Sequence, residues 1–186
     1  MTTYFIYNII LIEINNYTGG DLTMSTKDNL MAAFAGESQA NRKYLAFAKK
    51  AEAEGYKAAA RMFRAAAEAE TFHAHAHLNA ADGVGSTADN LKAAVGGETF
   101  EFEQMYPPYL EEAKAEGHDK AIRSITFAMK AEEVHARLFD EVLSNLSKED
   151  DSIYYLCPSC GYVEKNGTPE NCPICNVKGS SFIKID

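Results

Sequence analysis

Positive charge is scarce in this sequence. The 186 residues include 18 lysines and arginines against 27 aspartates and glutamates, which gives a formal net charge of −9 at pH 7. The basic residues form no stripe that could neutralise phosphates, which argues against nucleic acid and anionic membranes as partners. With 46% hydrophobic residues and no low-complexity tract, the chain is long enough for one core and a small appendage.

Cysteine is absent before Cys157, and all four cysteines lie between Cys157 and Cys175. This distribution favours metal binding over a disulfide framework. No secretory signal points to an oxidising compartment, so we expect a reducing, cytoplasmic setting.

Lysine and arginine are also absent before Lys27, so the apolar stretch Tyr4–Ile14 lacks the positive leading region of a signal peptide. The stretch is too short to cross a bilayer, and Gly19-Gly20-Asp21 breaks it. We interpret residues 1–23 as an N-terminal extension. It is either disordered or the product of a start codon upstream of Met24, and a docking strand is the third possibility.

The pattern Glu-x-x-His occurs twice, and the sequence around it repeats with an offset of 61 to 62 residues. Residues three apart share one face of a helix, so each such pair can hold one cation. The equivalent residues are Glu37 and Glu98, Tyr44 and Tyr106, Arg61 and Arg123, Glu70 and Glu132, and His73 and His135. Glu101 lies opposite Ala40. Two helical hairpins, each with a lone Glu and a Glu-x-x-His, predict a ferritin-like four-helix bundle.

Apolar spacing places the four helices and a small C-terminal module. We expect helices over 27–54, 57–81, from a cap at Ser86 or Thr87 onward, and over 119–146. Gly55 should end the first helix, and Pro107-Pro108 should kink or restart the third. The fold class is therefore mainly α, with a bundle over 24–148 and a small β module over 152–186 whose strands are 154–156 and 182–185.

Five glutamates lie on or beside the apolar stripes of these helices. Unpaired buried carboxylates cost several kcal/mol each, so a bundle that buries five of them needs cations. With two histidines they make seven candidate ligands for two metal ions, and this donor set suits iron or manganese. The candidate ligands are Glu37, Glu70, His73, Glu98, Glu101, Glu132 and His135. Either Tyr44 or Tyr106 could reach the metals, although core packing explains both equally well.

The module carries two Cys-x-x-Cys pairs, Cys157/Cys160 and Cys172/Cys175. Two such pairs close a tetrahedral site for one zinc or one iron, and spacing does not choose between them. Some thirty-five residues cannot build a sufficient apolar core, so the metal should stabilise this part. Asn176 stands where the first pair is followed by Gly161, and it tolerates a left-handed turn.

These motifs resemble the rubrerythrin family. The resemblance covers the chain from about Met24 to its end. It is carried by AFAGESQANRKY, AEAETFHAHAHL, VGGETFEFEQMYP, KAEEVHARLF and the CPSCGY and CPIC pairs. It implies a ferritin-like bundle with a non-haem di-iron site, followed by a rubredoxin-like domain with one iron, which zinc can replace in a recombinant preparation. Asn176, Pro108 and residues 1–23 depart from the family pattern, and none of them removes a ligand.

The resemblance also implies residue roles. Glu37, Glu70, Glu98 and Glu132 would ligate or bridge the irons and His135 would bind one of them, while Glu101 and His73 would alternate on the other iron. Together with Tyr44 and Tyr106, which match tyrosines near that site, Glu101 and His73 are the catalytic candidates. Cys157, Cys160, Cys172 and Cys175 would hold the rubredoxin-like iron.

The implied activity is peroxidase: reduction of hydrogen peroxide to water in protection against oxidative stress. The chain has no nucleotide-binding fingerprint, so electrons should come from an external reductase, NAD(P)H-linked or a rubredoxin, through the rubredoxin-like iron. The family implies a head-to-tail homodimer. One alternative is a ferroxidase or iron-binding ferritin-like protein. Another is a non-enzymatic zinc-ribbon adaptor, against which the buried glutamates argue.

Overall fold

The computed structural model describes residues 24–147 and 151–185. The predicted extension, residues 1–23, lies outside the described residues. Contacts divide the chain into two compact units between Val84 and Gly85.

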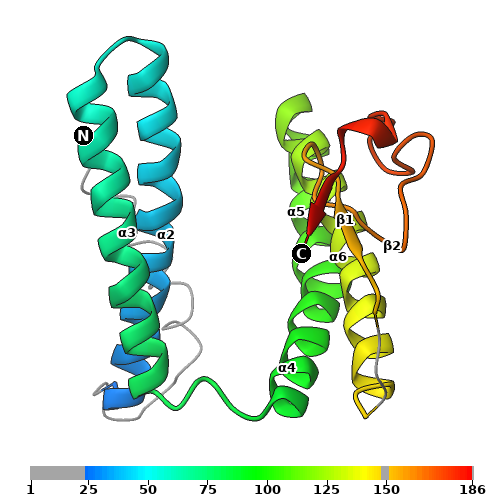
Figure 1. Cartoon of the computed structure of the whole chain (residues 1–186), viewed down its shortest axis with the longest axis horizontal. Helices are drawn as coiled ribbons and strands as arrows, with labels where there is room; N and C mark the ends of the chain where they lie inside the picture. The colour runs from blue at the N-terminus through cyan, green and yellow to red at the C-terminus, as the bar shows by residue number, and fades with distance from the viewer. Residues whose placement is uncertain (1–23, 148–150, 186) are drawn as a thin grey trace. The chain divides into compact units, whose positions relative to one another are not determined.

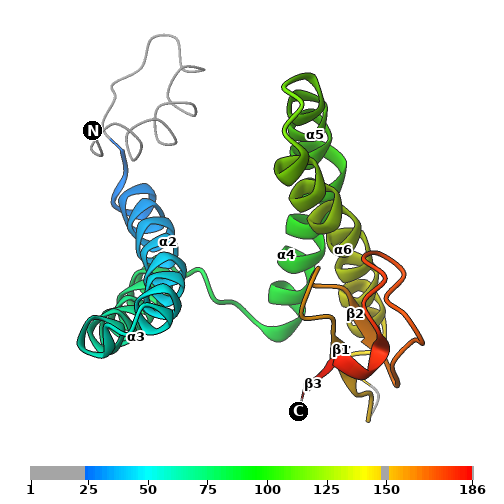
Figure 2. The same cartoon turned by 90° about the horizontal axis from the view of Figure 1, so that it is seen from above.

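The first unit is a hairpin of α2 (Thr26–Ala53) and α3 (Lys57–Ala80), which run side by side in Figures 1 and 2. Ser25 caps α2: its hydroxyl accepts a hydrogen bond from the Asp28 amide, and the Asp28 carboxylate accepts one from the Ser25 amide. Gly55 follows α2 with φ +84°, the left-handed position that ends many helices. The predicted boundaries of both helices are correct to within one residue.

Small residues line the contact between α2 and α3. Ala48, Ala60 and Ala67 are 2%, 0% and 1% exposed, so the two backbones lie close together. The buried Asn41 ties the helices, because its amide donates to the Ala67 carbonyl (2.6 Å) and to the Thr71 hydroxyl (2.8 Å). Larger apolar side chains of the same hairpin remain exposed, among them Phe47, Met62 and Phe72. An α-helical hairpin with this distribution has further apolar surface to bury, as the predicted bundle requires.

The second unit pairs a long segment with α6 (Asp119–Ser144). The segment runs through α4 (Thr87–Phe100), the π-helix η1 (Glu101–Met105) and α5 (Tyr106–Ala115). Ser86 caps α4 by accepting from the Asp89 amide. Pro107 and Pro108 fall in the first turn of α5, where a missing amide hydrogen costs little, so the predicted restart is confirmed. The π-helix was not predicted.

A three-stranded antiparallel sheet of order β2-β1-β3 forms the C-terminal module. β1 is Tyr154–Leu156, β2 is Val163–Lys165 and β3 is Ile183–Ile185, with Leu156 paired to both Val163 and Ile183. β1 and β3 were predicted, and β2 was missed. The 3₁₀ turn η2 (Gly179–Ser181) precedes β3. The module contacts α6: Val134 packs against its core, and Lys165 pairs with Glu141 at 2.6 Å.

The predicted fold class, a mainly helical chain of four helices with a small C-terminal strand module, is confirmed. The joining of the two hairpins into one bundle over 24–148 stays a prediction. None of the helices in the described residues is long and apolar enough to span a membrane.

Candidate metal centres

The first unit brings three predicted ligands together. Glu37 on α2 and Glu70 and His73 on α3 offer ligand atoms that all lie within 4.8 Å of one another. The His73 Nδ1 atom lies 3.1 Å from Glu70 Oε2 and 3.8 Å from Glu37 Oε2. The pKa of Glu37 is raised, first by a hydrogen bond with Glu70 and then by burial. The pKa of Glu70 is lowered by the same hydrogen bond and by a hydrogen bond with His73. The two carboxyl groups are therefore coupled, and Glu37 takes up a proton more readily than Glu70 does.

The second unit holds the equivalent group. Glu98 on α4 and Glu132 and His135 on α6 also lie within 4.8 Å of one another. The His135 Nδ1 atom is 2.7 Å from Glu132 Oε2 and 3.6 Å from Glu98 Oε2. The other ring nitrogen, Nε2, lies 2.9 Å from the Gly161 carbonyl oxygen, which can only accept a hydrogen bond. Nε2 therefore carries the hydrogen, and the lone pair of a neutral ring is on Nδ1, facing the two carboxylates.

A buried oxygen atom without a hydrogen-bond partner indicates that the second group fits a metal ion. Among the described residues, Glu98 Oε2 is buried and makes no hydrogen bond. Burial, and next the neighbouring Glu132, raise the pKa of Glu98, because a charge there is costly without a cation. A divalent cation bound by the Glu98 and Glu132 oxygens and His135 Nδ1 would satisfy the buried oxygen and remove that cost.

The π-helix η1 begins at the fifth predicted carboxylate, Glu101. Burial and the charge of Glu98 raise the pKa of Glu101, which places this side chain near the second group. At the end of η1 the Tyr106 amide donates to the Glu101 carbonyl, five residues back. Burial and then the charges of Glu101, Glu132 and Glu98 raise the pKa of Tyr106, so its phenol stays protonated at neutral pH.

The sequence contains a signal for η1. The two halves align with an offset of 61 residues at Glu37/Glu98 and of 62 residues at Tyr44/Tyr106. The second half therefore has one extra residue between Glu98 and Tyr106. One residue inserted in an α-helix is accommodated by a turn of π-helix, and such turns are frequent at functional sites.

Tyr44 has a different environment from its repeat equivalent. Its ring centroid lies 6.2 Å from that of Phe63 and 6.4 Å from that of Phe47, and the two phenylalanines are themselves 5.6 Å apart. These contacts are those of a packed aromatic cluster. Of the two tyrosines, Tyr106 lies near candidate metal-binding carboxylates of its own unit, namely Glu98, Glu101 and Glu132.

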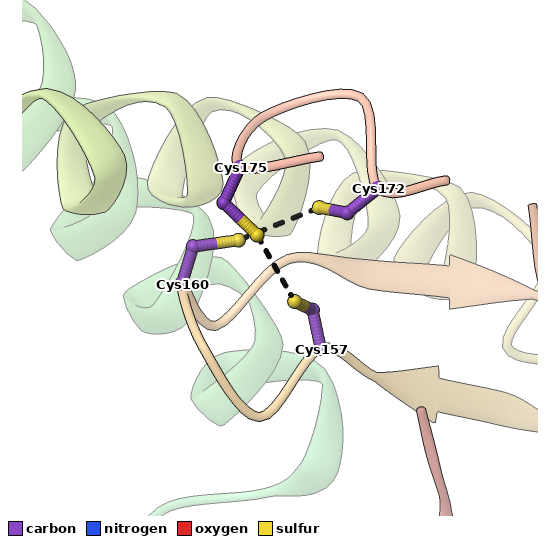
Figure 3. A group of neighbouring side chains, drawn as sticks. All are labelled: Cys157, Cys160, Cys172 and Cys175. Carbon is purple, nitrogen blue, oxygen red and sulfur yellow. Dashed lines mark hydrogen bonds between the residues drawn. The ribbon is translucent and has the colours of Figure 1, made fainter. Parts of the chain in front are cut away.

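The four cysteines form the third group. Their sulfur atoms converge from two loops in Figure 3, and all lie within 4.8 Å of one another as free thiols. Cys157 Sγ is 3.5 Å from Cys175 Sγ, and Cys160 Sγ is 3.5 Å from Cys172 Sγ. Distances near 3.5 Å suit thiolates around one ion and exceed the length of a disulfide.

The two loops have the same hydrogen-bond pattern. The Gly161 amide donates to the Cys157 carbonyl and the Asn176 amide to the Cys172 carbonyl, at 3.1 and 2.9 Å. Gly161 and Asn176 both have positive φ, +83° and +63°, as the sequence predicted for Asn176. Burial raises the pKa values of Cys160 and Cys172, whereas at Cys175 the Val177 amide and the other thiols outweigh burial and lower the pKa to about 7. A cation would hold all four sulfurs as thiolates.

Paired Glu-Glu-His groups on helices, combined with a four-cysteine module, define a helical metalloprotein with two kinds of metal site. The Rubrerythrin family model matches residues 28–143, and the model of the rubrerythrin rubredoxin-like domain matches residues 155–183. The chain belongs to the rubrerythrin family.

Similar proteins span almost the whole chain. Rubrerythrin-2 of Clostridium acetobutylicum is 37% identical over 175 residues, which cover 84% of this chain and 95% of the relative. Nigerythrin of Nitratidesulfovibrio vulgaris is 39% identical over 165 residues, covering 81% and 82%. The solved structure titled "Fully reduced state of nigerythrin (all ferrous)" aligns with a TM-score of 0.54 and 34% identity over 92% of this chain and 96% of that one. That title describes an iron protein, and the rubrerythrin family consists of oxidoreductases.

Sequence reasoning missed one contact at the candidate site, the hydrogen bond from His135 to the Gly161 carbonyl. It joins residues 26 positions apart that belong to different motifs, and no local pattern signals it. The roles of the individual ligands stay predictions.

Proposed function

We propose that this protein is a non-haem di-iron peroxidase that reduces hydrogen peroxide to water and receives its electrons through a rubredoxin-like iron in the four-cysteine module. The observation that carries the proposal is the direct contact between the two kinds of site. The His135 ring donates a hydrogen bond to the carbonyl oxygen of Gly161, the residue that follows Cys160. A short connected path of this kind is what a relay of single electrons needs.

The proposal requires the two Glu-Glu-His groups to combine into one dinuclear site, within one chain or between two chains of a homodimer. Neither group alone has enough ligands for two ions, whereas together with Glu101 they supply seven. Exposed apolar side chains on the first hairpin, such as Phe47 and Phe72, provide surface for that association.

Two bound irons would supply two electrons and Lewis acidity for the reaction H₂O₂ + 2e⁻ + 2H⁺ → 2H₂O. The chain's own residues have three tasks. The carboxylates keep the site close to neutral as its charge changes. The Gly161 carbonyl fixes the ring of His135 so that Nδ1 faces the Glu98 and Glu132 carboxylates, which would hold a metal ion together with it. The Tyr106 phenol stays protonated and can donate a hydrogen bond to an oxygen atom of the substrate.

Metal analysis and peroxide turnover test this function together. Protein purified without added zinc should hold about three irons per chain by this ligand count. It should consume hydrogen peroxide with oxidation of a supplied reductant, two electrons for each peroxide. Accumulation of ferric iron far above three per chain, without peroxide-dependent oxidation of the donor, would instead establish the ferroxidase. We further propose a cytoplasmic location and an external reductase as donor.

A further inference from the structure

A basic groove lies beside the four-cysteine module and has no role in the mechanism above. It has a volume of about 380 Å³ and is lined by Lys120, Arg123, Ser124 and Phe127 of α6 and by Ser159. Ser159 belongs to the loop that carries Cys157 and Cys160, so the groove borders the turn that holds a metal ligand. All of its walls belong to the second unit.

The charge of the groove is opposite to that of the chain. Lys120 and Arg123 are both exposed, whereas the whole chain has a net charge of −9. None of the five residues that line the groove carries a carboxylate. Most of this protein repels a partner with an acidic surface, whereas the groove attracts it. This difference favours the orientation in which the partner meets the groove.

The groove also offers an aromatic side chain and hydroxyl groups to a partner. The Arg123 guanidinium lies 5.1 Å from the centre of the Phe127 ring, so the cation is held over an aromatic side chain. Arginine and aromatic residues at the centre of a contact are those that carry most binding energy in protein interfaces. Hydroxyl groups of Ser124 and Ser159 add hydrogen-bonding groups on the two sides.

We propose that this groove is the docking surface for a small acidic one-electron carrier protein, which it places against the loop of Cys160. The inference rests on the proposed function, because it gives the relay its point of entry. An iron held by Cys157, Cys160, Cys172 and Cys175 would take one electron from the carrier in each encounter, passing from ferric to ferrous while the carrier is oxidised by one electron. Lys120 and Arg123 position the carrier and do not touch the metal.

The repeat supplies a matched control. Arg61 is the equivalent of Arg123 in the first half, and Lys57 and Arg61 lie near the start of α3 as Lys120 and Arg123 lie near the start of α6. All four side chains are exposed. The variants K120E/R123E and K57E/R61E therefore change the net charge equally and at a similar distance from a helix start, and only the first changes the groove.

The test uses the full-length iron-loaded protein and an acidic flavodoxin as the probe. Binding is measured by calorimetry, and the rate of flavin oxidation by stopped flow. At low salt we expect K120E/R123E to weaken binding and slow oxidation by about 10-fold to 100-fold relative to K57E/R61E. The difference should shrink to about 2-fold or less at roughly 0.5 M salt, where the Debye length is only a few Å.

Equal binding and equal rates for the two double variants would overturn the proposal. The proposal would also be overturned if K120E/R123E abolished probe binding only because it changed the oligomeric state. The groove would then be an interface between copies of this chain. Helical circular dichroism and iron content verify that both variants fold. Peroxide turnover with a small-molecule reductant needs no docking. If turnover is absent while binding still depends on the groove, the proposed function fails and the docking surface stands.

Discussion

The His135 Nε2 atom lies 2.9 Å from the carbonyl oxygen of Gly161, and this contact fixes two things at once. It determines which nitrogen of His135 faces the carboxylates of α4 and α6. It also sets the position of the four-cysteine module on α6, together with the ion pair of Lys165 and Glu141. A change in the Gly161 turn should therefore alter the position of the His135 ring in the candidate helical metal site.

The variant G161A tests this link. Gly161 has φ +83°, so alanine would strain the turn by about 1 kcal/mol and shift the carbonyl, although a Cβ would meet no atom within 4 Å. We expect slower electron transfer from the thiolate-bound iron to the helical irons, measured by stopped-flow absorbance. G117A is the control, because Gly117 has φ +66°, an equally open Cβ position and a place at the end of α5. Equal slowing in both variants would contradict the link.

Much of the fold could be predicted because its signals are local. Helix spacing, the Ser86 cap and the turn at Gly55 each involve residues a few positions apart, and the predicted helix boundaries agree closely with the structure. The grouping of Glu98, Glu132 and His135 followed from the repeat, which carries long-range information within the sequence itself.

Other features depend on packing between distant segments. The interior of the first hairpin is built from alanines and Asn41, because close contact between helices selects small residues, and the hydropathy pattern does not show which ones meet. β2 was missed because its side chains, Val163, Glu164 and Lys165, do not alternate as a clear strand. The sequence repeat shows that the second half has one extra residue between Glu98 and Tyr106. That this residue produces the π-helix η1 is seen only in the backbone hydrogen bonds of the structure.

Deletion of Gln104 tests the origin of η1. Gln104 is exposed, and its removal gives the second half the same spacing from Glu98 to Tyr106 as the first half has from Glu37 to Tyr44. We expect an uninterrupted α-helix in which Glu101 and Tyr106 no longer keep their present positions relative to each other. At least one iron should then bind more than about tenfold more weakly. E101A should reproduce the loss of metal affinity, measured by competition with a chelator, whereas E103A at an exposed position should not. Full metal affinity in the deletion variant would refute this account.

The metal-free protein should show an unusual dependence of stability on pH. Burial raises the pKa values of Glu98 and Glu101, so between the ordinary value of 4.5 and the raised values the folded state binds more protons than the unfolded state. The contribution of these two residues to the free energy of unfolding should therefore fall as pH rises above 4.5 through that window, and increase as pH is lowered back towards 4.5. Urea unfolding at several pH values measures it. The double variant E98Q/E101Q should lose this trend, and a trend of the same size in the variant would exclude these two residues as its cause.

Removal of the metal from the four-cysteine module should unfold the module and leave the helices intact. Within residues 151–185, the buried side chains of the module's apolar core are Cys157, Tyr162 and Cys172, with a few partly buried neighbours, so little apolar area stabilises the module without an ion. Burial also raises the pKa values of Cys160 and Cys172, which leaves these thiols protonated and without a charge partner once the metal is gone. After chelation, amide exchange over 151–185 should accelerate to the rate of an unfolded chain, while helical circular dichroism changes little. C160S should behave like the chelated protein, and S180A, an exposed change beside Gly179, should keep the protected amides. Protected amides in the chelated module would mean that its three strands and the Val134 contact suffice without metal.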